Sequence, residues 1–391
     1  MAFFDTDDIT AVMPFTLWML KILGVRGSRS DFRRYQFVVF WICFVTVGPK
    51  TFLGYRDDVD LIIRGVAEWI LESIIVIKVV IIGWNRNEFE QMLVLMRTWF
   101  KKTFASSYIS DEATLLAECN RAIDLFAKGY FTYCMIMVSL FNAGPMIQST
   151  LLYLNYDQNN SSRPEFKTHM EQEFYWLDIR TNFVHYTIYS VCAMVSYLLS
   201  SYLCAVEAVY VYSCCKCCSH MFDVIAIRLK SMASTKSTDQ LSGELADIIK
   251  MHVDTFRCVQ HLNDICLFAF AIQIFSCVLI WCSMAAYLTR NVDANAVNIV
   301  VLFVVITAET CGLCFLGTQL AYKSINVQNS VYDYPWYDAP IAIRRSLLRM
   351  LQRAQKRTGI TAAGFCFVDF ERFGSLVQTS YSIFIVLKDT L

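Results

Sequence analysis

The chain has 391 residues, of which 56% are hydrophobic and 17% are charged. Soluble domains carry about 25% charged residues, so this composition indicates a membrane protein. The formal net charge is zero, which gives no sign of nucleic-acid binding. The sequence has no glycine-rich phosphate loop, HExxH pair or GxSxG elbow, so we expect no enzyme, no catalytic residues and no cofactor.

Seven stretches contain the roughly 20 mostly apolar residues that a membrane helix needs. The first 35 residues lie outside them and lack the pattern of a signal peptide. The sequence therefore predicts an all-α membrane protein with seven transmembrane helices. These spans are 36–55, 61–85, 129–153, 182–212, 263–288, 296–322 and 369–388.

The second span is the most polar of the seven. Arg64, Glu68 and Glu72 follow one another at intervals of four residues, which puts them on one helix face. We interpret them as an intramembrane ion pair that faces other helices. The alternative is that they line a water-filled cavity.

Lysine and arginine residues predict the orientation, because they accumulate in cytoplasmic segments. The segment 1–35 and the connections after spans two, four and six carry at least five each, and the other connections carry three or fewer. We therefore expect a cytoplasmic N-terminus and an extracellular C-terminus, the reverse of G-protein-coupled receptors. Two overlapping glycosylation sequons, at Asn159 and Asn160, fall in the loop 156–181, on the expected extracellular side.

Four cysteines cluster at the expected cytoplasmic end of span four. A stable disulfide is not expected in the reducing cytosol, and one zinc ion cannot gather residues that point to different sides of a helix. We therefore expect no metal site. Palmitoylation is an open alternative. We interpret the cluster as small, mildly apolar residues that mark the boundary where the span leaves lipid; its members are Cys214, Cys215, Cys217 and Cys218.

The connection after span six contains a strongly amphipathic stretch, from Ile341 to Arg353. Its arginines lie largely opposite an apolar stripe, which favours packing against a partner helix. The stripe consists of Ile341, Ile343, Leu347, Leu348, Met350 and Leu351.

A set of residues in this C-terminal third carries a family resemblance. They are Gly317 after Phe315, Tyr332, Trp336-Tyr337, Pro340, Arg344-Arg345, Gln352, Gln355, Ala363-Gly364-Phe365, Phe370, Phe373, Thr379-Ser380-Tyr381-Ser382 and Phe384. In this pattern the chain resembles the insect odorant receptors; the upstream part matches them in architecture alone. Gustatory receptors typically end in a Thr-Tyr…Gln-Phe pattern that is absent here. The shared co-receptor has a longer connection between spans four and five, so the chain resembles a ligand-tuning subunit.

The resemblance implies a ligand-gated, non-selective cation channel, formed as a heterotetramer with the co-receptor and opened by a small volatile molecule. It implies a multi-pass protein of the plasma membrane, in the dendrite of a sensory neuron. The expected organisation is a cytoplasmic segment 1–35, a ligand-sensing bundle 36–212, a cytoplasmic connection 213–262, spans five and six in 263–322, an assembly region 323–368 and a pore helix with the extracellular C-terminus in 369–391. The resemblance also implies cytoplasmic helical extensions of spans four to seven, which form the region that assembles subunits.

The resemblance also implies three sets of functional residues. The pocket is expected among the outer halves of the spans, lined by Trp69, Ile70, Ser73, Asn142, Met146, Tyr186, Ser190, Met194, Trp281, Met284 and Tyr287. Subunit assembly is expected to involve Tyr332, Trp336, Tyr337, Arg344, Arg345, Gln352 and Gln355.

The third set lies in the last span. Tyr381, Phe384 and Lys388 are spaced i, i+3, i+7 and share a helix face. Phe384 suits a hydrophobic constriction, which gates by dewetting. Lys388 is expected at the outer mouth of the pore. The alternative is that its side chain extends to the membrane interface.

Three other classes remain as alternatives. A gustatory-receptor-like channel and an inverted seven-span receptor without its own pore share the architecture. A transporter would show internal repeats with matched broken helices. Span six has Gly312 and Gly317, but no second half of the sequence matches it.

Overall fold

A computed structural model of the protein describes residues 12–53, 59–105, 110–155, 165–233, 238–290 and 294–390. These ranges are almost entirely helical, which confirms the expected all-α class. The main non-helical parts are the segment 165–182, the connections around α10, and a small antiparallel pair of strands, β1 (Thr361–Ala362) and β2 (Cys366–Phe367), that precedes the last helix.

The N-terminal third consists of short helices and one longer one. Ser28 and Asp31 form a reciprocal capping box at the start of the second helix, which satisfies backbone N–H groups there. The predicted first span corresponds to three consecutive helical segments, and the predicted second span to a single helix. The elements are α1 (Pro14–Leu23), α2 (Arg29–Ile42), η1 (Cys43–Val47), α3 (Gly48–Phe52), α4 (Val59–Trp84) and α5 (Arg86–Ala105).

Four helices of 39 to 53 residues form the body of the protein. At 1.5 Å per residue each is much longer than the bilayer core, so each extends beyond its predicted span. The expected boundaries after residues 212, 262 and 322 all fall inside continuous helices. The four are α6 (Ser110–Leu154), α7 (Phe183–Met232), α8 (Thr238–Arg290) and α9 (Ala294–Tyr332).

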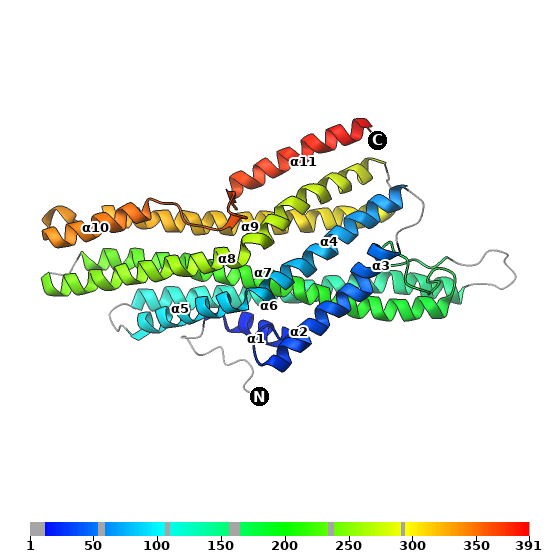
Figure 1. Ribbon diagram of the computed structural model, residues 1–391, viewed down its shortest axis with the longest axis horizontal. Coiled ribbons are helices and arrows are strands. Elements are labelled where there is room, and N and C mark those ends of the chain that lie inside the picture. The colour runs from blue at the N-terminus through cyan, green and yellow to red at the C-terminus, as the bar shows by residue number, and fades with distance from the viewer. Residues whose placement is uncertain are drawn as a thin grey trace.

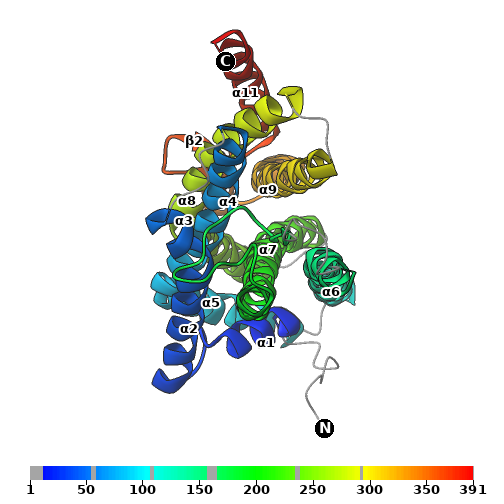
Figure 2. The ribbon, with the colours of Figure 1, turned by 90° about the vertical axis from the view of Figure 1, so that its right-hand side faces the viewer.

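Helix α7 lies at the centre of the bundle and packs on α6, α8 and α9 (Figures 1 and 2). Helix α10 (Ile341–Ala354) folds back along α9, and α11 (Phe370–Thr390) packs on α8 and α9 before it diverges from the other helices. The buried side of α10 comprises Ile343, Leu347 and Met350. Ile341 and Leu348 of the predicted apolar stripe are exposed instead.

Five of the described helices are long and apolar enough to cross a membrane. The two remaining predicted spans, in α4 and α11, are long enough but more polar, because α4 carries five charged residues and α11 carries charged residues at both ends. A total of seven spans therefore stays a prediction. The five qualifying segments are Arg29–Phe52, Asp111–Leu154, Phe183–Met232, Asp239–Ala285 and Phe303–Tyr332.

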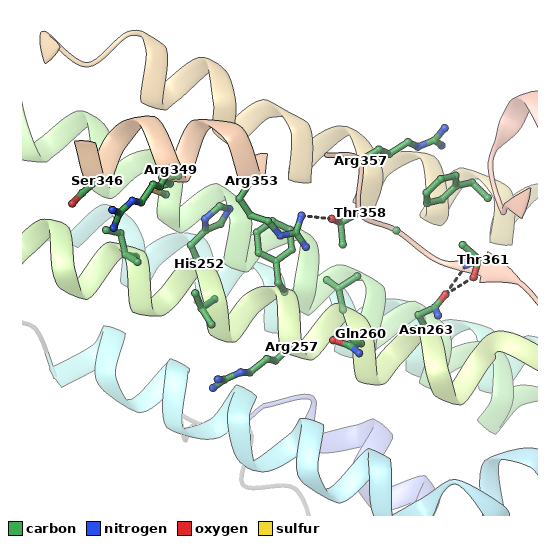
Figure 3. Close-up of a pocket in the computed structure, with 17 residues that line it drawn as sticks. His252, Arg257, Gln260, Asn263, Ser346, Arg349, Arg353, Arg357, Thr358 and Thr361 are labelled. Atoms are coloured by element: carbon green, nitrogen blue, oxygen red, sulfur yellow. Dashed lines mark hydrogen bonds between the residues drawn. The ribbon is translucent and has the colours of Figure 1, made fainter. Parts of the chain in front are cut away.

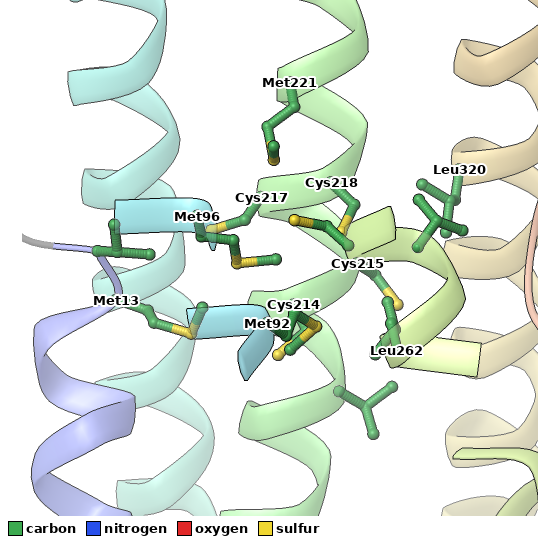
Figure 4. Packing of buried hydrophobic residues seen from close by; sticks show 14 of the residues in the cluster. Met13, Met92, Met96, Cys214, Cys215, Cys217, Cys218, Met221, Leu262 and Leu320 are labelled. Atoms are coloured by element: carbon green, nitrogen blue, oxygen red, sulfur yellow. The ribbon is translucent and has the colours of Figure 1, made fainter. Parts of the chain in front are cut away.

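The cysteine cluster of α7 lies in the interior of the protein (Figure 4). All four side chains are at most 1% exposed and belong to the main hydrophobic core, together with Met92, Leu262 and Leu320 of α5, α8 and α9. The cysteines therefore fill the core instead of marking a boundary with lipid. Such burial disfavours palmitoylation, and the described residues include no metal-binding group of three or more ligands.

Gly317 allows α9 to approach the segment that leads into α11. A Cβ atom at this position would lie 1.9 Å from the backbone oxygen of Val368, closer than any side chain can pack. A glycine is therefore required where the start of α11 meets α9.

We predict that Gly317→Ala lowers the free energy of unfolding by about 1–3 kcal/mol, because the added methyl group must displace backbone atoms. Gly312→Ala is the matched control on the same helix, since no heavy atom lies within 4 Å of its Cβ position. Thermal unfolding of the two purified variants tests this. Equal midpoints would contradict the required close approach.

Candidate functional site

The first buried ion cluster joins α3, α4 and the segment that follows α6. Lys50 Nζ lies 3.6 Å from Glu68 Oε2 and 3.3 Å from Glu72 Oε2, and all three side chains are buried. The backbone N–H of Glu171 also donates to Glu68 Oε2. The prediction that these glutamates face other helices is confirmed, but their cation is Lys50 of α3; the side chain of Arg64 lies outside the described residues.

A second buried ion cluster joins three helices in the middle of the bundle. Lys78 Nζ of α4 lies 3.1 Å from Glu207 Oε2 of α7 and 2.7 Å from Glu309 Oε1 of α9. Lys78 and Glu309 also line a cavity of about 120 Å³ between α4, α7, α8 and α9, with Gln273 and Ser276 of α8. This cluster was not predicted, although a lysine and two glutamates inside apolar stretches are a usable signal.

The predicted pocket residues of α6 and α7 form the first of two groups. Tyr186 is buried, and its hydroxyl donates to the Pro145 carbonyl oxygen at 3.1 Å, beside Met146. Asn142 and Ser190 are also buried, and Asn142 Oδ1 and Ser190 Oγ have no hydrogen-bond partner among the described residues. Half-buried Met194 also belongs to this group. The group therefore contains two hydrogen-bonding atoms without a described partner, among aromatic and apolar side chains.

Two further tyrosines on the same face of α7 were missed. Tyr189 and Tyr197 are buried, and their rings lie 6.1 Å and 5.9 Å from the ring of His169. Burial lowers the pKa of His169 to about 4, so its ring is neutral. The spacing of Tyr186, Tyr189 and Tyr197 matches one helix face, and this periodicity could have identified them.

The second group of predicted pocket residues lies between α4, α8 and α11. Trp281 and Met284 belong to one small hydrophobic cluster with Leu376 of α11, and Ile70 of α4 packs against it. The Trp281 ring meets the Phe373 ring of α11 edge-on, with centroids 6.0 Å apart. The predicted residues therefore divide between a group on α6 and α7 and a group that touches α11.

Three other predicted pocket residues have separate surroundings. Trp69 Nε1 donates to Thr51 Oγ1 at 2.9 Å, which directs this ring toward α3. Ser73 Oγ is buried without a hydrogen-bond partner among the described residues. The side chain of Tyr287 lies outside them, as do the predicted glycosylation positions Asn159 and Asn160.

The predicted pore residues lie on the diverging part of α11. Tyr381 and Lys388 are exposed and Phe384 is partly buried. Apolar side chains of the same helix, Ile383 and Val386, are exposed too. Within this chain α11 therefore presents both polar and apolar side chains to its surroundings.

The predicted assembly residues form an exposed aromatic and basic surface around the turn from α9 to α10. Tyr332, Trp336 and Tyr337 are 67%, 45% and 63% exposed. A cavity of about 290 Å³ lies between Tyr332, Trp336 and Arg344 and the leucines of α10. Arg345, Gln352 and Gln355 are exposed nearby.

Comparison with known families identifies this architecture. The family model described as "7tm Odorant receptor" matches residues 61–381, which is most of the chain. The chain belongs to the odorant receptor family.

Two fruit-fly members of the odorant receptor family show how far the sequence similarity extends. Odorant receptor 49a of Drosophila melanogaster is 24% identical over a region that spans only 43% of each chain. Odorant receptor 30a of the same species is 20% identical over 94% of this chain and 96% of its own length.

Solved structures of one insect receptor share the fold of this odorant receptor-family chain. The olfactory receptor OR5 from Machilis hrabei superposes with a TM-score of 0.75 at 15% identity, covering 96% of this chain and 97% of OR5. Its complex with eugenol gives a TM-score of 0.66 at 17% identity, covering 98% and 100%.

We predict that Lys50→Met lowers the free energy of unfolding by about 3–5 kcal/mol, because it leaves two buried carboxylates without their cation. Lys102→Met is the control, since Lys102 forms an exposed ion pair with Asp247, and such pairs contribute about 0–1 kcal/mol. Thermal unfolding of both variants in detergent is the measurement. A Lys50 variant as stable as the Lys102 variant would refute the role of this cluster.

Proposed function

We propose that this chain is the ligand-tuning subunit of an odorant-gated, non-selective cation channel and assembles with a co-receptor into a heterotetramer. The observation that carries the proposal is the exposure of α11, which diverges from the other helices of the chain. A helix that diverges from its own subunit, with polar and apolar side chains exposed together, is suited to line a pore with the equivalent helices of other subunits. Family membership supports the same role.

The orientation proposed for the membrane follows from the positive residues. The N-terminal segment 1–35, the 213–262 region and the 323–368 region lie in the cytoplasm, and the C-terminus and the 156–181 loop with its two sequons lie outside. The ends of α7, α8 and α9 beyond the spans then form a cytoplasmic assembly region with α10. The protein would reside in the plasma membrane of a sensory dendrite.

The exposed surface around the turn from α9 to α10 is the proposed contact with other subunits. Aromatic side chains and arginine are enriched at protein–protein interfaces, and Tyr332, Trp336, Tyr337 and Arg344 combine both here. Exposed leucine on α10, at Leu348, adds apolar area that a partner would cover.

The ligand is proposed to be a small volatile molecule bound by the α6–α7 group. OR5 has been solved in complex with eugenol, a small aromatic molecule with a polar end. Tyr186 and Met146 offer apolar contact, and the unpartnered Asn142 Oδ1 and Ser190 Oγ offer hydrogen bonds to such a molecule.

The α4–α8–α11 group is proposed to link ligand binding to the pore. Trp281 contacts Phe373 near the start of α11, so a shift of α8 against α4 would be transmitted directly to the pore helix. Its members would therefore control opening more than ligand affinity.

Co-expression of this chain with the co-receptor tests the proposed function. We expect a panel of volatile compounds to evoke cation currents from the pair, and single-channel recording from the purified pair to show unitary openings. G-protein signalling from the chain alone, with no current in the pair, would contradict a channel and favour an inverted receptor without its own pore.

We predict that Tyr186→Ala and Met146→Ala shift the odorant concentration for half-maximal current by about tenfold or more, since each removes contact area worth 1–3 kcal/mol. Trp281→Ala should instead change the maximal or basal current. Surface delivery of each variant is the control. Unchanged potency in both α6–α7 variants would refute this pocket.

We predict that Phe384→Ala raises the current in the absence of odorant, because a hydrophobic constriction closes the pore by excluding water. Val386→Ala, an exposed substitution on another face of α11, is the matched control. Equal basal currents in the two variants would show that the Phe384 ring is not the gate.

A further inference from the structure

A groove lies between α8 and α10 (Figure 3). It has a volume of about 660 Å³. One wall is the segment of α8 from Ile249 to Asn263, and the other is α10 from Ser346 to Arg353. Residues Arg357 to Thr361 and Phe367 close the end nearest the predicted membrane span.

Every charged side chain that lines this groove is an arginine. Arg257 pairs with Asp254 at 3.3 Å, and Arg357 pairs with Asp369 at 2.6 Å. Arg349 and Arg353, one turn apart on α10, have no carboxylate partner in the described part of the chain. The groove therefore presents two uncompensated guanidinium groups on the same helix face.

Arg353 is held in place by neutral contacts. Its guanidinium group stacks on the Phe256 ring at 3.6 Å from the centroid, and its Nη1 donates to Thr358 Oγ1 at 3.3 Å. A stacked, oriented guanidinium keeps its remaining N–H groups available, and their planar arrangement matches two oxygens of a phosphate group.

His252 supplies a buried polar group in the same groove. Its side chain is 3% exposed, and Nε2 has no hydrogen-bond partner among the residues that the structure describes. Burial and, secondarily, the charge of Arg353 lower the pKa of His252 to about 4, so the ring is neutral near pH 7. A buried imidazole nitrogen without a partner is costly unless a bound group satisfies it.

One end of the groove adjoins the start of the predicted span of α8, which the proposed orientation places at the inner leaflet. The predicted span of α8 begins at residue 263, and the α8 wall runs from there to residue 249, about 21 Å at 1.5 Å per residue. Basic pockets at the cytoplasmic ends of membrane helices bind phosphorylated lipid headgroups.

We propose that this groove binds the phosphorylated inositol headgroup of an anionic inner-leaflet lipid. Arg349 and Arg353 hold its phosphate groups, and His252 Nε2 hydrogen-bonds a phosphate or ring oxygen. Apolar walls such as Val253 and Phe256 accommodate the ring. The choice of a lipid, over a soluble inositol phosphate with the same phosphate chemistry, rests on the orientation given under the proposed function.

Binding to the full-length chain in nanodiscs tests the proposal without any channel current. The lipid probes are phosphatidylinositol bisphosphate in phosphatidylcholine and, at matched charge, phosphatidylserine; the soluble probe is inositol trisphosphate. We expect the double variant Arg349→Gln, Arg353→Gln to weaken binding of the bisphosphate lipid by about tenfold or more, because it loses charge-assisted hydrogen bonds to the phosphates. Lys356→Gln, an exposed cation just after α10 and outside the groove, should leave it unchanged.

The outcomes separate the proposal from its competitors. Arg349→Gln alone should weaken binding as well, and because its side chain makes no described polar contact this loss cannot be ascribed to misfolding. Stronger binding of the soluble probe than of the lipid would overturn the lipid source. Equal binding of phosphatidylserine would overturn the headgroup site in favour of general electrostatic attraction to anionic lipid. Arginine variants that no longer bind the co-receptor but still bind the lipid would overturn it in favour of a subunit contact. Normal odorant currents without bisphosphate-lipid binding would refute this proposal and leave the channel intact.

Discussion

The pairing of two buried carboxylates with a single lysine, in each of two clusters, constrains how the helices of this structure pack. Lys78 reaches Glu207 and Glu309 from α4, so it fixes how far α4 can slide along α7 and α9. An unpaired charge at this depth would cost several kcal/mol, so the three helices must keep a common register. Lys50 imposes the same constraint on α3 and α4 through Glu68 and Glu72.

The Lys78 cluster joins helices that carry both groups of predicted pocket residues. The α6–α7 group lies where α6 meets α7, and the α4–α8–α11 group includes the contact of Trp281 with Phe373 of α11. A ligand that alters the packing of α7 would therefore act on α4 and α9 through shared charges, and on α11 through Trp281 and Phe373. Under the proposed function, packed contacts of this kind would convert small shifts into gating.

Local sequence patterns predicted the helices well and their partners poorly. Apolar runs located α4, α6, α7, α8, α9 and α11 but not α5, and the amphipathic period located α10, because both patterns are properties of a single segment. The pairing of Lys50 with Glu68 and Glu72, the burial of Cys214 in the core and the division of the pocket residues all depend on how helices distant in sequence meet. The π-helical turn at Cys43–Val47 likewise left no mark in hydropathy. Helical extensions of the spans were expected from the family resemblance, and hydropathy alone did not indicate where α7 and α8 continue.

The most direct measurement is thermal unfolding of a Lys78 series. Lys78→Met alone should lower the midpoint strongly, because Glu207 and Glu309 lose their shared cation. Adding Glu207→Gln and Glu309→Gln to that variant should restore much of the loss, since removing all the buried charges together abolishes the penalty. A triple variant less stable than Lys78→Met would contradict charge neutralisation as the constraint that holds α4, α7 and α9 in register.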